Sequence, residues 1–406
     1  MKILHTADWH LGQKFLFYDR EKEHQHAIDW LLNLIEKEKI DALIVAGDIF
    51  DIGNPPNYAR KLYYKFLTKL QLTSCRYVII TGGNHDSPSM LNAPKDLLEA
   101  LNVYVVGAAT ENLEDEIILL KNTENEIEAI VAAVPFLRDR DLRTSFSGES
   151  STDRITRIKE GIYNHYAQLA EFAAKYKKLN VPIIATGHLY AKGALSSAKQ
   201  DNIYIGNLEN IEAEQFPQLF DYVALGHLHR AQIVGGMEHI RYSGSIIPLS
   251  FSEIQDKKSV NLIHFKNKKI DKIEVISIPV FRELVTVKGS LEAIQRKLDK
   301  LAVQFSETDL PAWVEVIIET EKLIPNLDNL LNDYTKEMNL ELLKISTNRQ
   351  FYNLESQTEQ LNLDDLDHVD VFKKKCESFG SPPDEMKELL ATFHELENWM
   401  EEERDE

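Results

Sequence analysis

The sequence predicts an α/β protein that carries a small α+β domain and a helical tail behind it. Over the first 190 residues, short apolar or β-branched runs alternate with longer amphipathic stretches, as strands and helices do in α/β proteins. Near residue 230 this alternation gives way to paired strand-like runs joined by Gly or Asn turns. From residue 283 the pattern is strand, helix, strand, helix, strand, and no convincing strand follows Asn348.

The strands expected in the core are short runs of apolar and β-branched residues. Two amphipathic helices, at 20–39 and 56–71, separate some of them. Two hairpins, at 233–244 and 260–278, are expected to complete the core as an antiparallel sheet. The core strands are KILHT (2–6), ALIVAG (42–47), RYVIIT (76–81), AIVAAV (129–134), PIIAT (182–186) and DYVALG (221–226).

The second half of the chain suggests two further parts. Strands at 283–289, 312–320 and 340–346 alternate with helices at 290–305 and 324–338. This order predicts a compact α+β domain. We therefore divide the chain into a main domain (1–280), a small α+β domain (281–348) and a helical tail (349–406).

Composition restricts the class of protein. No apolar run approaches the roughly 20 residues of a membrane span, and the N-terminus lacks a signal-peptide core, so we expect a soluble cytoplasmic protein. Two cysteines, Cys75 and Cys376, give no disulfide framework and suit a reducing compartment. The net charge is −19, but residues 351–406 hold 17 acidic and 5 basic side chains. The rest of the chain is therefore much less acidic, and its charge does not exclude a nucleic-acid partner.

Polar side chains of the metal-binding type follow five of the expected strands. Ligands of open α/β sheets bind at the carboxyl ends of strands, so these side chains are expected to meet. A lone His beside a strand is most often structural, but a structural explanation here would need five separate coincidences. The residues are Asp8, His10, Asp48, Asp51, Asn84, His85, Asp86, His188, His227 and His229.

These residue types point to a particular chemistry. Carboxylate, amide and imidazole donors suit divalent ions such as Mn²⁺, with Mg²⁺ as the alternative, and no cysteine lies in these motifs. The donors are more than one ion needs. Two ions about 3.5–4 Å apart can activate a water and stabilise the attacking and leaving oxygens of a phosphoester. The pattern predicts a two-metal hydrolase of phosphoesters.

Five short motifs resemble those of the calcineurin-like metallophosphoesterases: DxH (8–10), GDxxD (47–51), GNHD (83–86), GH (187–188) and GHLH (226–229). Longer stretches such as ILHTADWHLGQ, VAGDIFDIGNPP, IYIGNLENI and RYSGSIIPLSF resemble the SbcD family of nuclease subunits. This resemblance is strong over residues 1–280 and looser beyond them. It implies a metallophosphoesterase β-sandwich flanked by helices. It also implies that residues 281–348 form a separate domain that caps the DNA.

The resemblance also implies a ligand set for two metal ions. A first ion would be held by Asp8, His10 and His229. A second would be held by Asn84, His188 and His227. Asp48 would bridge the two ions.

The same resemblance implies catalytic roles for residues beside the ligands. His85 stands next to a ligand without being one, and matches the catalytic histidine that acts on the scissile phosphate and the leaving oxygen. Asp51 matches the position that often orients this histidine, although many relatives have a histidine there. Asp86 is the alternative for that role, but we expect it to cap the helix that follows.

The implied function is a DNA nuclease. Members of the family hydrolyse phosphodiester bonds in DNA ends and hairpins, as 3'-5' double-strand exonucleases and single-strand endonucleases. They act with an SbcC-type ATPase that carries a coiled coil, in DNA repair, replication and recombination. Two other classes stay open: a phosphatase or cyclic-nucleotide phosphodiesterase with the same ligands, and a silent DNA-binding scaffold. The extra domain and tail argue against the first, and the complete ligand set argues against the second.

Two amphipathic regions suggest protein partners. The stretches 57–70 and 89–101 are rich in apolar residues at helical spacing, and in the family such helices pair two copies, so we expect a homodimer; core packing is the alternative. The acidic tail would repel DNA, yet it carries two apolar stripes, and we expect it to dock on the SbcC-type ATPase. Packing on the small domain is the alternative for the tail. The stripes are Leu363, Leu366, Val369 and Phe372, and Met386, Leu389, Leu390, Phe393, Leu396 and Met400.

Overall fold

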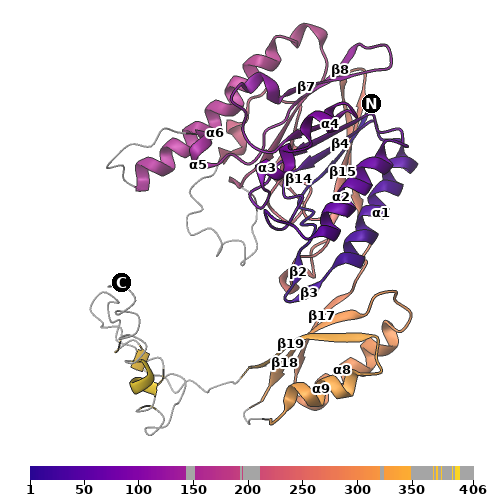
Figure 1. Cartoon of the computed structure of the whole chain (residues 1–406), viewed down its shortest axis with the longest axis vertical. Coiled ribbons are helices and arrows are strands. Elements are labelled where there is room, and N and C mark those ends of the chain that lie inside the picture. The colour runs from indigo at the N-terminus through magenta and orange to yellow at the C-terminus, as the bar shows by residue number, and fades with distance from the viewer. Residues whose placement is uncertain are drawn as a thin grey trace. The chain divides into compact units, whose positions relative to one another are not determined.

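The computed structural model describes residues 1–142, 151–192, 194, 211–320 and 324–348, and in the tail residues 369, 372–373, 376, 386 and 389–393. It divides into two compact units, Met1–Asn348 and Arg349–Glu406 (Figure 1). None of the helices in the described residues combines the length and the apolar character that a membrane span requires.

The first of two large sheets is mixed. Its strands β1, β4, β5 and β6 run parallel, and β15 and β16 add an antiparallel edge beside β1. All five residues of β4 are buried, as expected for a parallel strand covered on both faces. In order across the sheet the strands are β16 (Lys269–Ser277), β15 (Ser259–Lys266), β1 (Lys2–Thr6), β4 (Ala42–Ala46), β5 (Tyr77–Thr81) and β6 (Val103–Val106).

The second large sheet is also mixed. Its strands β8, β9, β12 and β14 run parallel, with β7 and β13 antiparallel at the two edges. In order across the sheet the strands are β13 (Gln232–Val234), β14 (Met237–Tyr242), β12 (Tyr222–Gly226), β9 (Ile183–His188), β8 (Ile127–Ala132) and β7 (Ile117–Lys121).

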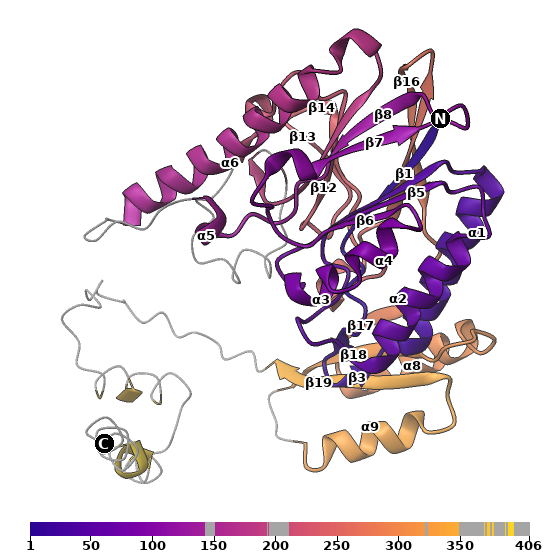
Figure 2. The ribbon, with the colours of Figure 1, turned by 45° about the horizontal axis from the view of Figure 1, so that its top comes forward.

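The two sheets pack face to face and helices cover their outer faces. Ile44 and Ile79 of the first sheet share one buried cluster with Val131 and Ala224 of the second. The outer face of the first sheet packs against α1 (Glu21–Glu38), α2 (Asn57–Leu70), α3 (Pro88–Asn92) and α4 (Lys95–Glu99). The outer face of the second packs against α6 (Ser151–Ala174), which follows the short α5 (Asp139–Leu142) (Figure 2). The expected sandwich flanked by helices is therefore confirmed.

The small domain has the expected order of elements. Its sheet is wholly parallel, β17 (Leu284–Gly289), β18 (Ala312–Glu319) and β19 (Leu340–Asn348), and it packs against α8 (Leu291–Gln304) and α9 (Leu327–Thr335). Trp313 of β18 contacts Phe15 of the main domain, with ring centroids 5.2 Å apart. Phe15 belongs to a hairpin of two short strands, β2 (Lys14–Phe15) and β3 (Tyr18–Asp19).

The remaining described elements are short. Strands β10 (Ala191–Lys192) and β11 (Ile211–Glu212) pair with each other. Four 3₁₀ helices are η1 (Leu113–Glu116), η2 (Lys177–Leu179), η3 (Ala213–Gln215) and η4 (Phe251–Glu253).

Three details of the fold differ from the sequence prediction. The two hairpins form no separate antiparallel sheet; each adds an edge to a different mixed sheet. Strands β6 and β7 were not expected. The apolar residues of α2 are buried in the chain's own core, since Leu62, Phe66 and Leu70 are at most 5% exposed. Of the large apolar side chains in the stretches that suggested a dimer, those that stay exposed are Tyr64 of α2, at 39%, and Leu97 and Leu101 in and after α4, at 71% and 43%.

The tail is described at only a few positions. The rings of Phe372 and Phe393 stack with centroids 4.2 Å apart, so the two apolar stripes contact each other at these two residues. Cys376 is buried. Residues Leu363, Leu366, Leu396 and Met400 of the stripes lie outside the described residues, as does 203–210, which is the motif IYIGNLENI without its last residue.

Candidate metal centre

The polar residues at the strand ends come together between the two sheets. The first sheet brings Asp8 and His10 after β1, Asp48 after β4 and Asn84 after β5, and the second brings His188 at the end of β9 and His227 and His229 after β12. The main chain links neighbouring loops: the amide of Asp8 donates to the carbonyl of Gly47, and the amide of His10 donates to the carbonyl of Asp48. The backbone therefore brings ligand candidates from five strands to one place.

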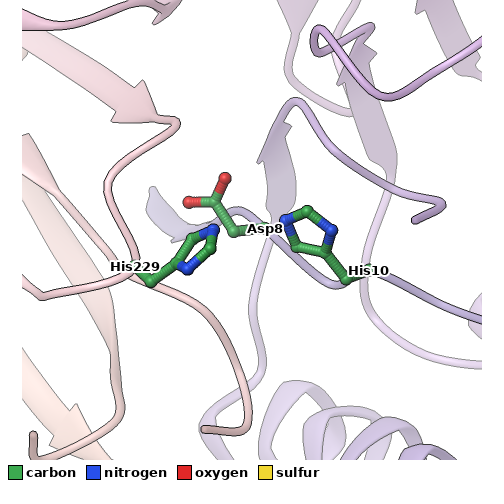
Figure 3. Close-up of side chains that lie close together, drawn as sticks. All are labelled: Asp8, His10 and His229. Carbon is green, nitrogen blue, oxygen red and sulfur yellow. The ribbon is translucent and has the colours of Figure 1, made fainter. Parts of the chain in front are cut away.

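The first group consists of Asp8, His10 and His229, whose donor atoms all lie within 4.8 Å of one another (Figure 3). Asp8 and His10 are almost fully buried. Among the described residues, neither Oδ2 of Asp8 nor Nε2 of His10 has a hydrogen-bond partner. Burying an unsatisfied polar atom is costly, so these two atoms fit a cation as their missing partner.

The second group is formed by Asn84, His188 and His227. The side-chain oxygen of Asn84 lies 3.0 Å from Nε2 of His188 and 3.1 Å from Nδ1 of His227. Asp48 stands between the two groups, because its Oδ2 lies 3.2 Å from Nε2 of His188 and 3.5 Å from Nε2 of His10. The geometry thus places Asp48 where a bridging carboxylate would have to be.

Three of the imidazoles are held at Nδ1, which leaves Nε2 as the nitrogen available to a metal ion. Nδ1 of His188 donates to the carbonyl of Ala46 at 2.9 Å, and Nδ1 of His10 and of His229 face the carboxylates of Asp51 and Glu253 at 3.0 and 3.1 Å. Such acceptors fix the tautomer and orientation of metal-binding histidines. The donor set therefore fits two divalent ions of the kind that oxygen and imidazole ligands select.

The backbone at this site adopts uncommon conformations. Asp8, His10, Asp48 and His227 all have positive φ angles, of 51°, 45°, 50° and 100°. Non-glycine residues rarely adopt such angles, and those that do cluster at functional sites where the surrounding structure stabilises them. One such interaction is the hydrogen bond from the amide of His227 to Oδ1 of Asp8, at 2.9 Å.

Two glycines are needed because neighbouring groups occupy the space of a side chain. Gly47 has φ of 86°, and a Cβ there would overlap the ring of His188. A Cβ on Gly226 would overlap the carbonyl oxygen of Ala46. These positions allow β4, β9 and β12 to approach closely enough for their following residues to meet.

Charge and burial shift the protonation of the ligands. Burial lowers the pKa of an imidazole, but for His10 the hydrogen bond with Asp51 and the charge of Asp48 outweigh it and raise the pKa to about 9. The charge of Asp48 likewise overcomes burial and raises the pKa of His188 to about 9. For His227, burial and the neighbouring His188 lower the pKa to about 3. Burial raises the pKa of Asp8.

His85 lies beside the first group and is exposed. Its Nδ1 lies 2.7 Å from the main-chain carbonyl oxygen of Asp51, and its ring meets that of His10 edge to face at 4.9 Å. Asp51 was expected to orient His85, and the contact between the two residues is made by the main chain of Asp51. The carboxylate of Asp51 contacts His10, and only its main-chain carbonyl holds His85.

The prediction that Asp86 caps the next helix is wrong. Helix α3 is capped by Ser87, whose side chain accepts from the amide of Met90. The buried carboxylate of Asp86 instead accepts hydrogen bonds from three amides, those of Ile49, Phe50 and Gly83. It therefore fastens the loop after β4 to the loop after β5, a cross-link that sequence spacing could not reveal.

Glu253 was missed by sequence reasoning. It lies in η4, is 4% exposed, and accepts from Nδ1 of His229. It stands 24 residues after His229 in a loop without a strand-end motif. No local signal marks it, because only the folding of residues 245–258 against the end of β12 brings it to the site.

Comparison with known proteins gives consistent matches. The calcineurin-like phosphoesterase model matches residues 1–231, and the Type 5 capsule protein repressor C-terminal domain model matches residues 280–378. The chain is 40% identical over 351 residues to the SbcD subunit of nuclease SbcCD from Escherichia coli (strain K12), covering 86% of each chain. It is 35% identical over 316 residues to the SbcD protein of Rhodobacter capsulatus, covering 75% of this chain and 76% of the relative.

One more distant relative matches over nearly the whole chain, and one solved structure matches only weakly. The SbcD protein of Bacillus subtilis is 28% identical over 415 residues, covering 99% of both chains. A dimetal phosphatase from Danio rerio superposes with a TM-score of 0.39 at 12% identity, covering 69% of this chain and 99% of that one, which is too weak to support an argument. Family model and relatives together decide the assignment: the chain belongs to the calcineurin-like phosphoesterases and, within them, to the family of SbcD nuclease subunits.

Proposed function

We propose that this chain is the nuclease subunit of an SbcCD-type complex and that it hydrolyses phosphodiester bonds in DNA with two divalent ions, Mn²⁺ before Mg²⁺. The observation that carries this proposal is the placement of Asp48 between two donor groups, beside an exposed His85. Asp8, His10 and His229 would hold one ion, and Asn84, His188 and His227 the other. When bound, the ions supply a nucleophilic water and stabilise charge on the phosphate oxygens.

His85 is the residue of the chain best placed to transfer a proton. A carbonyl oxygen can only accept a hydrogen bond, so the contact with Asp51 requires the hydrogen on Nδ1 of His85. With a second proton on Nε2, the ring can donate a hydrogen bond to the phosphate or pass that proton to the leaving oxygen. The amide of His85 donates to Oδ1 of Asp48 at 3.0 Å, which ties the position of this residue to the bridging carboxylate.

DNA is favoured over a small phosphoester as substrate for two reasons. The similarity to proteins named as parts of a nuclease covers 86% of the chain and includes much of the small domain. That domain contacts the hairpin β2–β3, which follows directly on His10, so a long substrate at the metal centre would meet both domains. A phosphatase or cyclic-nucleotide phosphodiesterase needs no such second surface, and the complete donor set speaks against a silent scaffold.

Several finer properties belong to the same proposal. We assign residues 1–280 to catalysis, 281–348 to capping the DNA and 349–406 to docking an SbcC-type ATPase with a coiled coil. The expected activities are 3'-5' double-strand exonuclease and single-strand endonuclease cleavage, in repair, replication and recombination in the cytoplasm. A homodimer would use the exposed Leu97 and Leu101, and a monomer in light scattering at micromolar concentration would refute that part.

One experiment tests the central proposal. The purified chain is incubated with Mn²⁺ or Mg²⁺, with and without an SbcC-type ATPase, on labelled linear, hairpin and single-stranded DNA, and on p-nitrophenyl phosphate esters. Metal-dependent cleavage of DNA, with duplex cleavage stimulated by the ATPase and ATP, is expected. Hydrolysis of the small esters without any cleavage of DNA would overturn the nuclease proposal in favour of a phosphatase.

A further inference from the structure

The side chain of His229 is held by a residue far along the chain. Its Nδ1 lies 3.1 Å from Oε1 of Glu253, and Glu253 is almost completely buried. His229 itself follows β12 in a loop, and its side chain is 18% exposed. The orientation of this candidate ligand is therefore set by a contact with another segment.

Glu253 is in turn fixed on its other oxygen. Oε2 accepts from Nζ of Lys258 at 2.7 Å and from the amide of Leu249 at 3.1 Å. Nζ of Lys258 also donates to the carbonyl oxygen of His229 at 3.0 Å and to Oγ of Ser245 at 2.8 Å. The pair Glu253–Lys258 thus contacts both the side chain and the main chain of His229.

The segment that carries Glu253 is itself well anchored. Phe251 and Ile254, on either side of it, pack against the buried cluster of Phe15, Leu284 and Trp313. An ion pair between Arg230 and Asp256, at 2.7 Å, adds a second link between the His229 loop and this segment. The carboxylate of Glu253 is already buried and anchored. It therefore loses little further conformational entropy when it orients a metal-binding histidine.

We propose that Glu253 is a positioning residue for His229. The inference rests on the proposed metal centre and adds to it a role for a residue outside the five motifs. Glu253 keeps the hydrogen of His229 on Nδ1 and turns Nε2 toward Asp8 and His10. Loss of such a partner lowers metal affinity by about 10- to 100-fold in known sites.

The test compares two double variants that both remove the buried charge pair. Glu253→Gln with Lys258→Met keeps an oxygen that accepts from His229, whereas Glu253→Leu with Lys258→Met removes it. The chain offers a matched control in Glu274, which lies 3.5 Å from Nε2 of His264 and 2.6 Å from Nζ of Lys272 on an exposed surface. The control is Glu274→Leu with Lys272→Met. Calorimetric Mn²⁺ titration and thermal unfolding are measured for each.

We expect the Leu variant to bind one Mn²⁺ about 10- to 100-fold more weakly, and the Gln variant and the control to stay within about threefold of the parental chain. Parental affinity in a folded Leu variant would overturn the inference, as would equal weakening in the Gln and Leu variants. A parental chain that binds no Mn²⁺ would overturn the proposed metal centre, and this inference with it.

A second measurement decides the matter even if the Leu variant does not fold. In the metal-free parental chain with nitrogen-labelled histidine, the His229 signal, assigned by its loss in His229→Gln, should show the hydrogen on Nδ1. The Gln variant should keep this state. A mixture of the two tautomers in the parental chain would contradict the positioning role of Glu253.

Discussion

The main-chain carbonyl oxygen of Asp51 lies 2.7 Å from Nδ1 of His85, whereas the carboxylate of the same residue contacts His10. One residue thus supports both the candidate catalytic histidine and a candidate metal ligand, through different atoms. Substitution of the Asp51 side chain can affect only one of these contacts directly. Several predictions about the site depend on this separation.

His85→Gln and His85→Leu should bind Mn²⁺ like the parental chain but lose cleavage. The imidazole is exposed and donates to a carbonyl oxygen, so its removal leaves the ligand groups in place. Loss of a general acid typically lowers the rate by about 10²- to 10⁴-fold. Calorimetry checks that Mn²⁺ binding is retained, and a cleavage assay on single-stranded DNA checks that activity is lost. Cleavage at the parental rate would show that His85 has no catalytic role.

Asp51→Ala should weaken Mn²⁺ binding by about 10- to 100-fold, because His10 loses the acceptor for its Nδ1. The carbonyl that holds His85 is retained, so at saturating Mn²⁺ the cleavage rate should stay within about threefold of the parental rate. Titration of activity against Mn²⁺ separates the two effects. A rate at saturation as low as that of His85→Gln would mean that the Asp51 side chain does orient the catalytic histidine.

Asp48→Ala should remove both ions and all activity. Its Oδ2 lies within 3.5 Å of a histidine from each donor group, so its loss takes a ligand from both. It also removes the acceptor for the amide of His85. Calorimetry that shows two retained Mn²⁺ sites would contradict the bridging position. Asp51→Ala, three residues away in the same loop, serves as the comparison, since it should retain two weaker sites.

Mn²⁺ binding should release protons and strengthen as the pH rises to about 9. In the metal-free protein the pKa values of His10 and His188 are raised to about 9, so both rings are protonated at neutral pH. A metal ion requires the neutral ring, so each displaced proton makes the apparent affinity rise about tenfold per pH unit below the pKa. Titration in buffers of different ionisation enthalpy counts the released protons. A constant affinity from about pH 7 to about pH 9 would contradict the raised pKa values.

Deletion of residues 351–406 should separate the two proposed activities. Mn²⁺-dependent cleavage of single-stranded DNA by the isolated chain should survive, because the candidate metal centre lies wholly within Met1–Asn348. Binding to an SbcC-type ATPase and ATP-stimulated cleavage of duplex DNA should fail. The outcome that would count against tail docking is a truncated chain that binds the ATPase with parental affinity.

The stacked rings of Phe372 and Phe393 refine this last expectation. The two apolar stripes contact each other, so part of the apolar surface that the sequence left without a partner is covered within the tail. Leu389 is still 37% exposed. A docking surface would therefore be formed by the paired helices rather than by each stripe alone. Phe393→Ala in the full chain should weaken ATPase binding by disrupting that pair.

The sandwich was implied by the family resemblance. The sequence by itself determined the alternation of strands and helices and the set of residues gathered at one edge. Both follow from local rules: a buried parallel strand needs a continuous apolar run, and the residue after it must lie at the sheet edge. That is why Asp8, Asp48, Asn84 and His188 could be picked out from short motifs, and why the structure does bring them together. The order of elements in the small domain was readable for the same reason.

Only the tertiary structure decided which atoms face each other and what each helix covers. The sequence of α2 predicts an apolar face but does not say whether that face packs on the chain's own sheet or on a second copy of the chain. The fold buries this face in the chain's own core. Asp86 holds amides of two loops, Asp51 uses its carboxylate for His10, and Glu253 reaches His229 from 24 residues away. Such contacts depend on how separate loops fold over one another. Sequence spacing constrains only the positions of residues along a single strand or helix, so it cannot predict these contacts between loops.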